Sequence, residues 1–179
     1  GAREKLRIGF YGPSEPWMQA LMERYDLQGV VTLHGVVSRS EALRRQRESQ
    51  ILLLLGWANP QETGQHTGKL FEYFGSRRPI LAVGGVRGVL TEALEETGAG
   101  IHALSKSQLR QFLIQSYAEF RERGEVRFRG NPDELMKYTH PAMARNFSAL
   151  LDARCHREVA SLPGDRTAEL SGVGDRSGV

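Results

Sequence analysis

The sequence has few of the features that mark several protein classes. It contains one cysteine, Cys155, which excludes an intramolecular disulfide and a cysteine-based zinc site and fits a reducing compartment. Its longest apolar runs, such as residues 51–55, are much shorter than the ~20 residues that a membrane-spanning helix needs. The first residues show no signal-peptide pattern. We therefore expect a soluble, cytoplasmic protein, and the length of 179 residues predicts one main domain.

The chain also has little excess of positive over negative charge. The chain has 24 Lys and Arg against 21 Asp and Glu, so its formal net charge is only +3. So small a surplus, spread over the whole surface, does not indicate a nucleic-acid partner, and we expect none. Hydrophobic residues make up 40% and charged residues 25% of the chain, which excludes wholesale disorder and a membrane bundle.

Glycine, in contrast, is abundant: 20 of 179 residues, about 11% against a usual ~7%. Many of these glycines border short, continuous apolar runs, which are typical of buried strands in a parallel sheet covered on both faces. The predicted strands are residues 5–11, 30–34, 51–55, 79–83 and 101–104.

Helical patterns lie between these strands. They cover residues 16–25, 38–48, 69–75, 89–97 and 106–123, and a further helix is predicted over 133–154 with a kink or division at Pro141. Ser38 followed by Glu41 forms a capping box, and Ser105 is a predicted N-cap. The alternation predicts an α/β fold, a Rossmann-like three-layer parallel sheet with helices on both faces. We assign residues 1–160 to this domain and 161–179 to a poorly packed C-terminal tail.

A ligand site in such a sheet lies at the carboxyl ends of the strands, where glycine allows sharp turns and close approach. Glycines occupy this edge after four of the predicted strands, at Gly12, Gly35, Gly56 and the pair Gly84 and Gly85. A tight turn explains each one taken singly. As a set, they favour a ligand-binding edge.

The longest connection, residues 57–68, leads into a predicted helix through His66, Thr67, Gly68 and Lys69. Free N–H groups and the positive dipole end of that helix suit a phosphate, although Lys69 is equally explained as an exposed surface lysine. Glu72, one turn later, can accept hydrogen bonds from the two hydroxyls of a ribose. The alternatives are an ion pair with Lys69 or a solvated helix charge.

Two familiar nucleotide motifs are absent. The segment from Gly64 to Leu70 looks like a P-loop, but it has three residues rather than four between its glycines and lacks the Ser or Thr after the lysine. No G-x-G-x-x-G fingerprint occurs near Gly12, so nothing supports a dinucleotide cofactor. We expect no cofactor and no metal.

The stretches ILLLLGW (51–57) and TGKLFEYFGSRRPILAVGG (67–85) carry a family resemblance. They resemble the donor-binding C-terminal domain of retaining GT-B glycosyltransferases of group 1, or family four. The segments VVTLHGVVSRSEALRRQRESQ (30–50), GGVRGVLTEALEETGAGI (84–101) and YTHPAMARNF (138–147) are similar to the same domain. The resemblance covers roughly residues 5–153, and it implies one half of a GT-B fold.

The resemblance implies roles for individual residues. Glu72 matches the glutamate that binds the nucleotide ribose. Thr67, Gly68 and Lys69 match the helix start near the donor diphosphate and sugar. The backbone of Gly35, Val36 and Val37 matches the segment that meets the base. The family often has a second glutamate eight residues before the ribose glutamate, and here that position is Gly64.

The function implied is the donor-binding domain of a bacterial-type retaining glycosyltransferase in polysaccharide or glycoconjugate biosynthesis, with a UDP-, GDP- or similar nucleotide-sugar as donor. The N-terminal acceptor-binding domain of that family is missing, so we expect an excised fragment that is inactive alone, with unassigned catalytic residues. Association with the inner membrane face is expected for the full-length enzyme alone. The alternatives are a UDP-sugar 2-epimerase-like domain and a non-catalytic Rossmann-like binding or interaction module.

Overall fold

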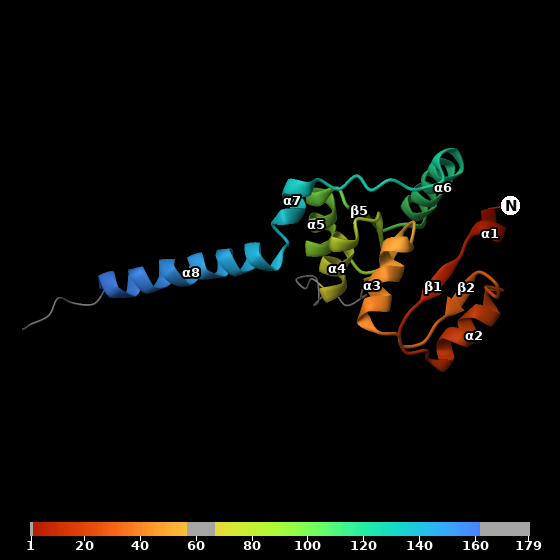
Figure 1. The fold of residues 1–179 in the computed structure, drawn as a ribbon, viewed down its shortest axis with the longest axis horizontal. Helices are drawn as coiled ribbons and strands as arrows, with labels where there is room; N and C mark the ends of the chain where they lie inside the picture. Colours follow the sequence, from red (N-terminus) through yellow and green to blue (C-terminus); the bar gives the residue numbers. More distant parts are fainter. Residues whose placement is uncertain (1, 57–66, 162–179) are drawn as a thin grey trace, which may run out of the picture. The chain divides into compact units, whose positions relative to one another are not determined.

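Strands and helices alternate in the computed structural model, which describes residues 2–56 and 67–161 (Figure 1). This order confirms the predicted α/β class. The described residues fall into two compact units divided between Tyr138 and Thr139. The first unit contains α1 (Ala2–Lys5), β1 (Ile8–Phe10), α2 (Pro16–Arg24), β2 (Val31–Leu33), α3 (Arg39–Glu48), β3 (Leu52–Leu55), α4 (Gly68–Ser76), β4 (Ile80–Val83), α5 (Val89–Thr97), β5 (Gly100–Ala103), α6 (Lys106–Arg123) and α7 (Pro132–Met136), and the second contains α8 (His140–Ser161).

All of the strand pairs are parallel, as predicted, but the strands form two hydrogen-bonded ladders. One ladder pairs β1 with β2, and the other has the order β3-β4-β5. The apolar runs predicted the individual strands because a strand that is buried on both faces is apolar along its whole length. They carry no information on which strands are neighbours, so the division between β1 and β3 could not be predicted from them.

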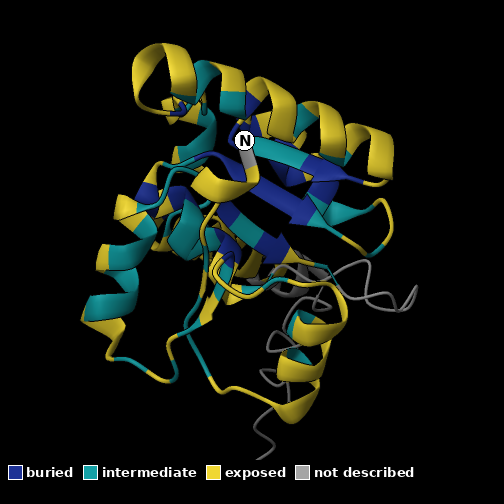
Figure 2. Cartoon of the chain, turned by 90° about the vertical axis from the view of Figure 1, so that its right-hand side faces the viewer, coloured by how far each residue is buried: buried dark blue, intermediate teal, exposed yellow. Residues whose placement is uncertain are grey.

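The core lies where α4 and α5 pack on the β3-β4-β5 ladder. Strand β4 is central, and its residues Ile80, Leu81 and Ala82 are buried, as are Leu70 and Phe74 of α4. Figure 2 shows the buried residues gathered on the strands and on the inner sides of helices, whose outer surfaces are exposed. Burial of these side chains stabilises the fold by roughly 1.5–3 kcal/mol for each large one.

Several helix ends follow the sequence signals. Ser38 Oγ accepts a hydrogen bond from the Glu41 N–H (3.2 Å), and Ser105 Oγ accepts one from the Gln108 N–H (3.2 Å). The Glu41 carboxylate pairs with arginines of its own helix, so no hydrogen bond is recorded for the other half of the predicted capping box. Helix α6 ends at Gly124, which is left-handed with φ +77°.

The helix predicted over 133–154, with a kink or division at Pro141, is divided just before that residue. The chain forms α7, breaks over residues 137–139, and resumes as α8. Pro141 lies in the first turn of α8, where its missing N–H leaves no intrahelical bond unmade, so it is accommodated without a kink there. The helix also continues beyond residue 154, to Ser161.

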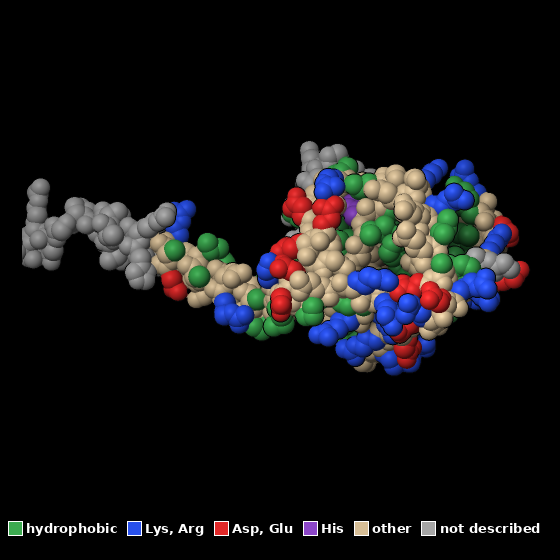
Figure 3. Space-filling model, turned by 90° about the horizontal axis from the view of Figure 1, so that it is seen from above, with side chains coloured by type: hydrophobic (Ala, Val, Ile, Leu, Met, Phe, Trp, Pro, Cys, Tyr) green, Lys and Arg blue, Asp and Glu red, His purple; other side chains and the backbone are tan. Residues whose placement is uncertain are grey.

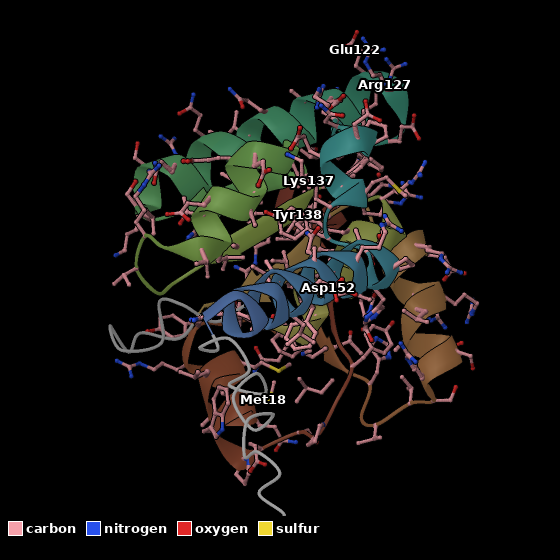
Figure 4. The ribbon with its side chains drawn as sticks, turned by 90° about the vertical axis from the view of Figure 1, so that its left-hand side faces the viewer. Met18, Glu122, Arg127, Lys137, Tyr138 and Asp152 are labelled. Atoms are coloured by element: carbon pink, nitrogen blue, oxygen red, sulfur yellow. The ribbon has the colours of Figure 1, made fainter. Side chains whose placement is uncertain are left out.

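The residues after α7 connect α5 with α4 (Figure 4). Lys137 Nζ and Tyr138 Oη each donate to the Glu96 carboxylate of α5 at 2.8 Å, and the Tyr138 ring packs edge-on to Phe74 of α4 with centroids 5.2 Å apart. Hydrogen bonds from Lys137 and then Tyr138 lower the pKa of Glu96 to about 2. Burial, followed by the bond to Glu96, raises the pKa of Tyr138 to about 12.

Helix α8 has an exposed apolar face, with Phe147, Leu150 and Leu151 all at least half exposed. Their spacing of three and four residues places them on one side of the helix. Within residues 2–56 and 67–161, no helix combines the length and the apolar character needed to cross a membrane.

Candidate functional site

The first candidate element is the N-terminus of α4. Thr67 precedes the helix in an extended conformation, and its side chain does not cap the helix. Its hydroxyl oxygen is buried and has no hydrogen-bond partner in the described part of the chain. The first N–H groups of a helix have no intrahelical partner, so Gly68 and Lys69 bring free donors to the same place. The predicted site residues Gly64 and His66 lie outside the described residues.

Lys69 is exposed on the first turn of α4. Among the described side chains, no carboxylate lies within ion-pair distance of its amine, so the ion pair with Glu72 that was one alternative does not form. A cationic amine, a hydroxyl without a partner among the described residues and the N–H groups of a helix start are the kinds of group that suit an anion.

Glu72 lies one turn further along α4, against α3. Its Oε2 accepts a hydrogen bond from Gln46 Nε2 at 3.4 Å, and its Oε1 lies 3.6 Å from Arg39 Nη2. Its side chain is 35% exposed, and Arg39 is 81% exposed. Both contacts are long, so the residues that the structure describes leave most of the hydrogen-bonding capacity of the carboxylate unused.

The loops that follow β1 and β2 form a second group. The Gly12 N–H donates to the Gly35 carbonyl at 2.9 Å, and the Tyr11 and His34 rings stack with centroids 4.4 Å apart. Val36, the next residue along the chain, is 78% exposed.

The two groups are connected through Arg39. The base-facing candidates Val36 and Val37 lead into Ser38 and then into Arg39, which pairs with Glu72. The structure therefore brings Gly12 together with Gly35, and brings the start of α3 to the carboxylate of α4.

The loops after β3 and β4 meet at two glycines. A Cβ atom on Gly56 would lie 2.7 Å from the Gly84 carbonyl oxygen, closer than real Cβ contacts, so no larger residue fits there without backbone movement. Gly84 and Gly85 have φ values of +81° and +75°. At least one strand-edge glycine, Gly56, therefore lies where two backbone segments approach each other closely.

A buried polar chain holds the Gly84 turn. His102 of β5 contacts the Gly84 carbonyl through Nε2 (2.6 Å) and the Thr91 hydroxyl through Nδ1 (2.8 Å). The Gly84 carbonyl oxygen can only accept, so Nε2 carries a proton and donates to it, and the Thr91 oxygen also accepts from the Gly88 N–H. Sequence reasoning missed His102 and Thr91, although a histidine within an apolar strand was a usable signal.

A hollow of about 310 Å³ lies between α5, β5 and α6 and contains none of the predicted site residues. Gln108, Gln111 and Gln115 line it beside His102. Its one carboxylate, Glu95, is paired with Arg87 at 2.7 Å. The residues that the structure describes include no group of three metal-ligating side chains.

Comparisons with known proteins give a likeness to solved structures. No protein-family model matches the sequence, and no curated protein matches it significantly. The structure is similar to that of AviGT4, a glycosyltransferase involved in avilamycin A biosynthesis, with a TM-score of 0.55 and 17% sequence identity. The likeness covers 89% of this chain and 46% of AviGT4, so the chain spans just under half the length of that protein. The fold is the Rossmann-like half of a GT-B fold.

The partners of Glu72 were not predicted. Arg44 and Arg45 of α3 form ion pairs with Glu41 and Glu48 of the same helix. Figure 3 shows such basic and acidic side chains intermixed on the surface. Arg39 and Gln46 instead point to Glu72, because α3 packs against α4, and no local sequence pattern reports that packing.

Proposed function

We propose that this chain is the nucleotide-sugar-binding domain of a retaining glycosyltransferase of the bacterial group 1 type, acting in the cytoplasm in polysaccharide or glycoconjugate biosynthesis. The observation that carries the proposal is the open carboxylate of Glu72, which Arg39 links to the segment after Gly35. The GT-B half-fold supports it, because ligands of such sheets bind at the carboxyl ends of the strands.

Each part of the donor has a matching group. The ribose hydroxyls donate to the Glu72 carboxylate, and the base lies against the backbone of residues 35–37. The diphosphate lies at the start of α4, where Thr67 Oγ1, the N–H groups of Gly68 and Lys69, and the Lys69 amine receive it. Negative charge builds on the diphosphate as the sugar leaves, and these fixed donors stabilise that charge.

Transfer needs an acceptor, which in this proposal is bound by a second domain. The chain spans under half the length of AviGT4, so we propose that it binds the donor and does not transfer the sugar alone. Gly64 stands where the resembled family often has its first glutamate, and the sugar contact therefore comes from other groups. No cofactor besides the donor is required.

A direct titration tests the site. Isothermal calorimetry with UDP-, GDP- and ADP-glucose is expected to show binding of at least one donor. Glu72→Ala should weaken that binding about 10- to 100-fold, because charge-assisted hydrogen bonds contribute ~1.5–3 kcal/mol each. The matched control is Glu95→Ala, which removes the same charge from α5 and should leave the affinity unchanged.

Two results would contradict the proposal. If no nucleotide-sugar binds, the chain is better described as a non-catalytic interaction module. If Glu72→Ala and Glu95→Ala bind the donor equally well, Glu72 is not the ribose ligand. Sugar transfer by this chain alone would refute the need for a second domain.

A further inference from the structure

The side-chain amide of Gln46 lies between two groups of α4. Ser76 Oγ donates to Gln46 Oε1 at 2.9 Å, and Gln46 Nε2 donates to Glu72 Oε2 at 3.4 Å. Ser76 is buried, with 8% of its surface exposed, and its hydroxyl also donates to the Glu72 carbonyl oxygen at 3.0 Å, so its one proton is shared between the two acceptors. These contacts form a relay from Ser76 through Gln46 to the Glu72 carboxylate.

The relay has a defined direction. If the amide turned over, its oxygen would face the carboxylate and two acceptors would meet, whereas the observed orientation sets a donor against it. Gln46 and Ser76 are both partly or fully shielded from water, which strengthens this preference. The amide therefore favours the rotation of the carboxylate that turns Oε2 toward Gln46.

The ion-pair partner that the described residues provide for the carboxylate cannot fix it in the same way. Arg39 is 81% exposed, and 3.6 Å is too long for a hydrogen bond. Exposed pairs of this kind contribute little and leave the long side chain mobile.

We propose that Gln46 is a positioning residue that orients the Glu72 carboxylate toward the two adjacent hydroxyls of a ribose, and so sets the preference of this chain for ribonucleotides over 2′-deoxyribonucleotides. The inference rests on the proposed function. A carboxylate held in one rotation meets two neighbouring hydroxyls at once, whereas a freely rotating one loses entropy on making the second bond. A 2′-deoxyribose offers a single hydroxyl, so it gains little from that orientation.

The test compares affinities for two nucleotides. Calorimetry would give Kd values for whichever of UDP, GDP and ADP binds best and for its 2′-deoxy counterpart. We expect the wild type to prefer the ribonucleotide by about 10-fold or more, since loss of one charge-assisted hydrogen bond has that effect. Gln46→Leu keeps the side-chain size and removes the amide. It should cut the preference to about one third or less, by weakening ribonucleotide binding and leaving deoxyribonucleotide binding unchanged.

Two further variants sharpen the test. Ser76→Ala removes the group that orients the amide and should reduce the preference in the same direction, with a smaller change. It also carries the test if Gln46→Leu does not fold. Gln111→Leu makes the same replacement on α6, away from Glu72, and should retain the wild-type preference.

The failures can be told apart. A wild-type preference that survives both Gln46→Leu and Ser76→Ala overturns this inference alone. Equal weakening of both nucleotides by Gln46→Leu does so as well, because it indicates a merely structural role. If the wild type binds no nucleotide, the proposed function fails and the inference fails with it.

Discussion

At the scale of single residues, Gly100 shows how closely two strands can approach. It pairs with Ile80 across the β4–β5 ladder, and a Cβ atom at Gly100 would lie 1.9 Å from the Ile80 carbonyl oxygen. That neighbour is backbone, so it cannot move aside as the end of a flexible side chain would. Gly75, in α4, is the opposite case, because a Cβ atom there would meet nothing within 4 Å.

We therefore expect Gly100→Ala to lower the free energy of unfolding by about 2 kcal/mol or more, as overpacking in a buried ladder does. Gly75→Ala should instead raise it by about 0.5–1 kcal/mol, since alanine favours a helix interior over glycine. Urea unfolding followed by circular dichroism measures both. Equal effects of the two substitutions would contradict this account of the β4–β5 ladder.

The candidate site was predictable residue by residue only in part. Glu72 was predicted as a site residue from its place one turn after a helix start and from the family resemblance, and Thr67, Gly68 and Lys69 from the same helix start and resemblance. Its partner Gln46 was not found, because it lies 26 positions upstream and the contact depends on how α3 packs against α4. The spacing of residues within a segment predicts which helix a side chain lies on. It does not predict which other helix packs against that one.

At the scale of elements, the ends of α5 and α6 were predicted to the residue because caps mark them. Ser105 caps the start of α6, and Gly98 and Gly124 end α5 and α6 in left-handed conformations. The break between α7 and α8 was predicted at Pro141, whereas it spans residues 137–139. The tertiary contacts of Lys137 and Tyr138 with Glu96 coincide with the interruption.

Those contacts form a clasp of Glu96, Lys137 and Tyr138 that should give stability a characteristic dependence on pH. The pKa of Glu96 is near 4.5 in the unfolded chain and about 2 in the folded one. The clasp therefore stabilises the fold above pH 4.5, and this contribution is lost as the pH falls toward 2. The pKa of Tyr138 is raised from an ordinary 10 to about 12, so this group stabilises the fold below pH 10. Its contribution is lost as the pH rises from 10 to 12.

Glu96→Gln should accordingly unfold at lower urea concentration than the wild type at pH 7, and the difference should shrink between pH 4.5 and pH 2. Urea midpoints measured across that range test the prediction. Glu92→Gln, on the exposed side of the same helix, should follow the wild type throughout. A Glu96→Gln difference that stays constant down to pH 2 would show that its origin is not the carboxylate charge.

At the scale of the whole molecule, the buried core that the structure describes lies mainly in the first unit. Leu70 is fully buried between α4 and the β3-β4-β5 ladder, whereas Leu150 of α8 is 67% exposed. The same chemical change at the two positions should therefore have very different effects.

Leu70→Ala is expected to lower the free energy of unfolding by about 2–5 kcal/mol, the range for a leucine removed from a packed core. Leu150→Ala should change it by no more than about 0.5 kcal/mol. Urea unfolding at a single protein concentration compares the two. A large loss of stability in Leu150→Ala would show that the exposed face of α8 is covered in solution.

The division of the strands into two ladders also bears on how the chain folds. Every ladder pair joins strands that are neighbours in sequence, with paired residues only 20 to 28 positions apart. Loop-closure entropy changes by about 0.3 kcal/mol over that range, so no strand pairing is entropically much harder to form than another. Each strand–helix–strand unit can pair as soon as its second strand has been synthesised, before the strands of the next ladder exist.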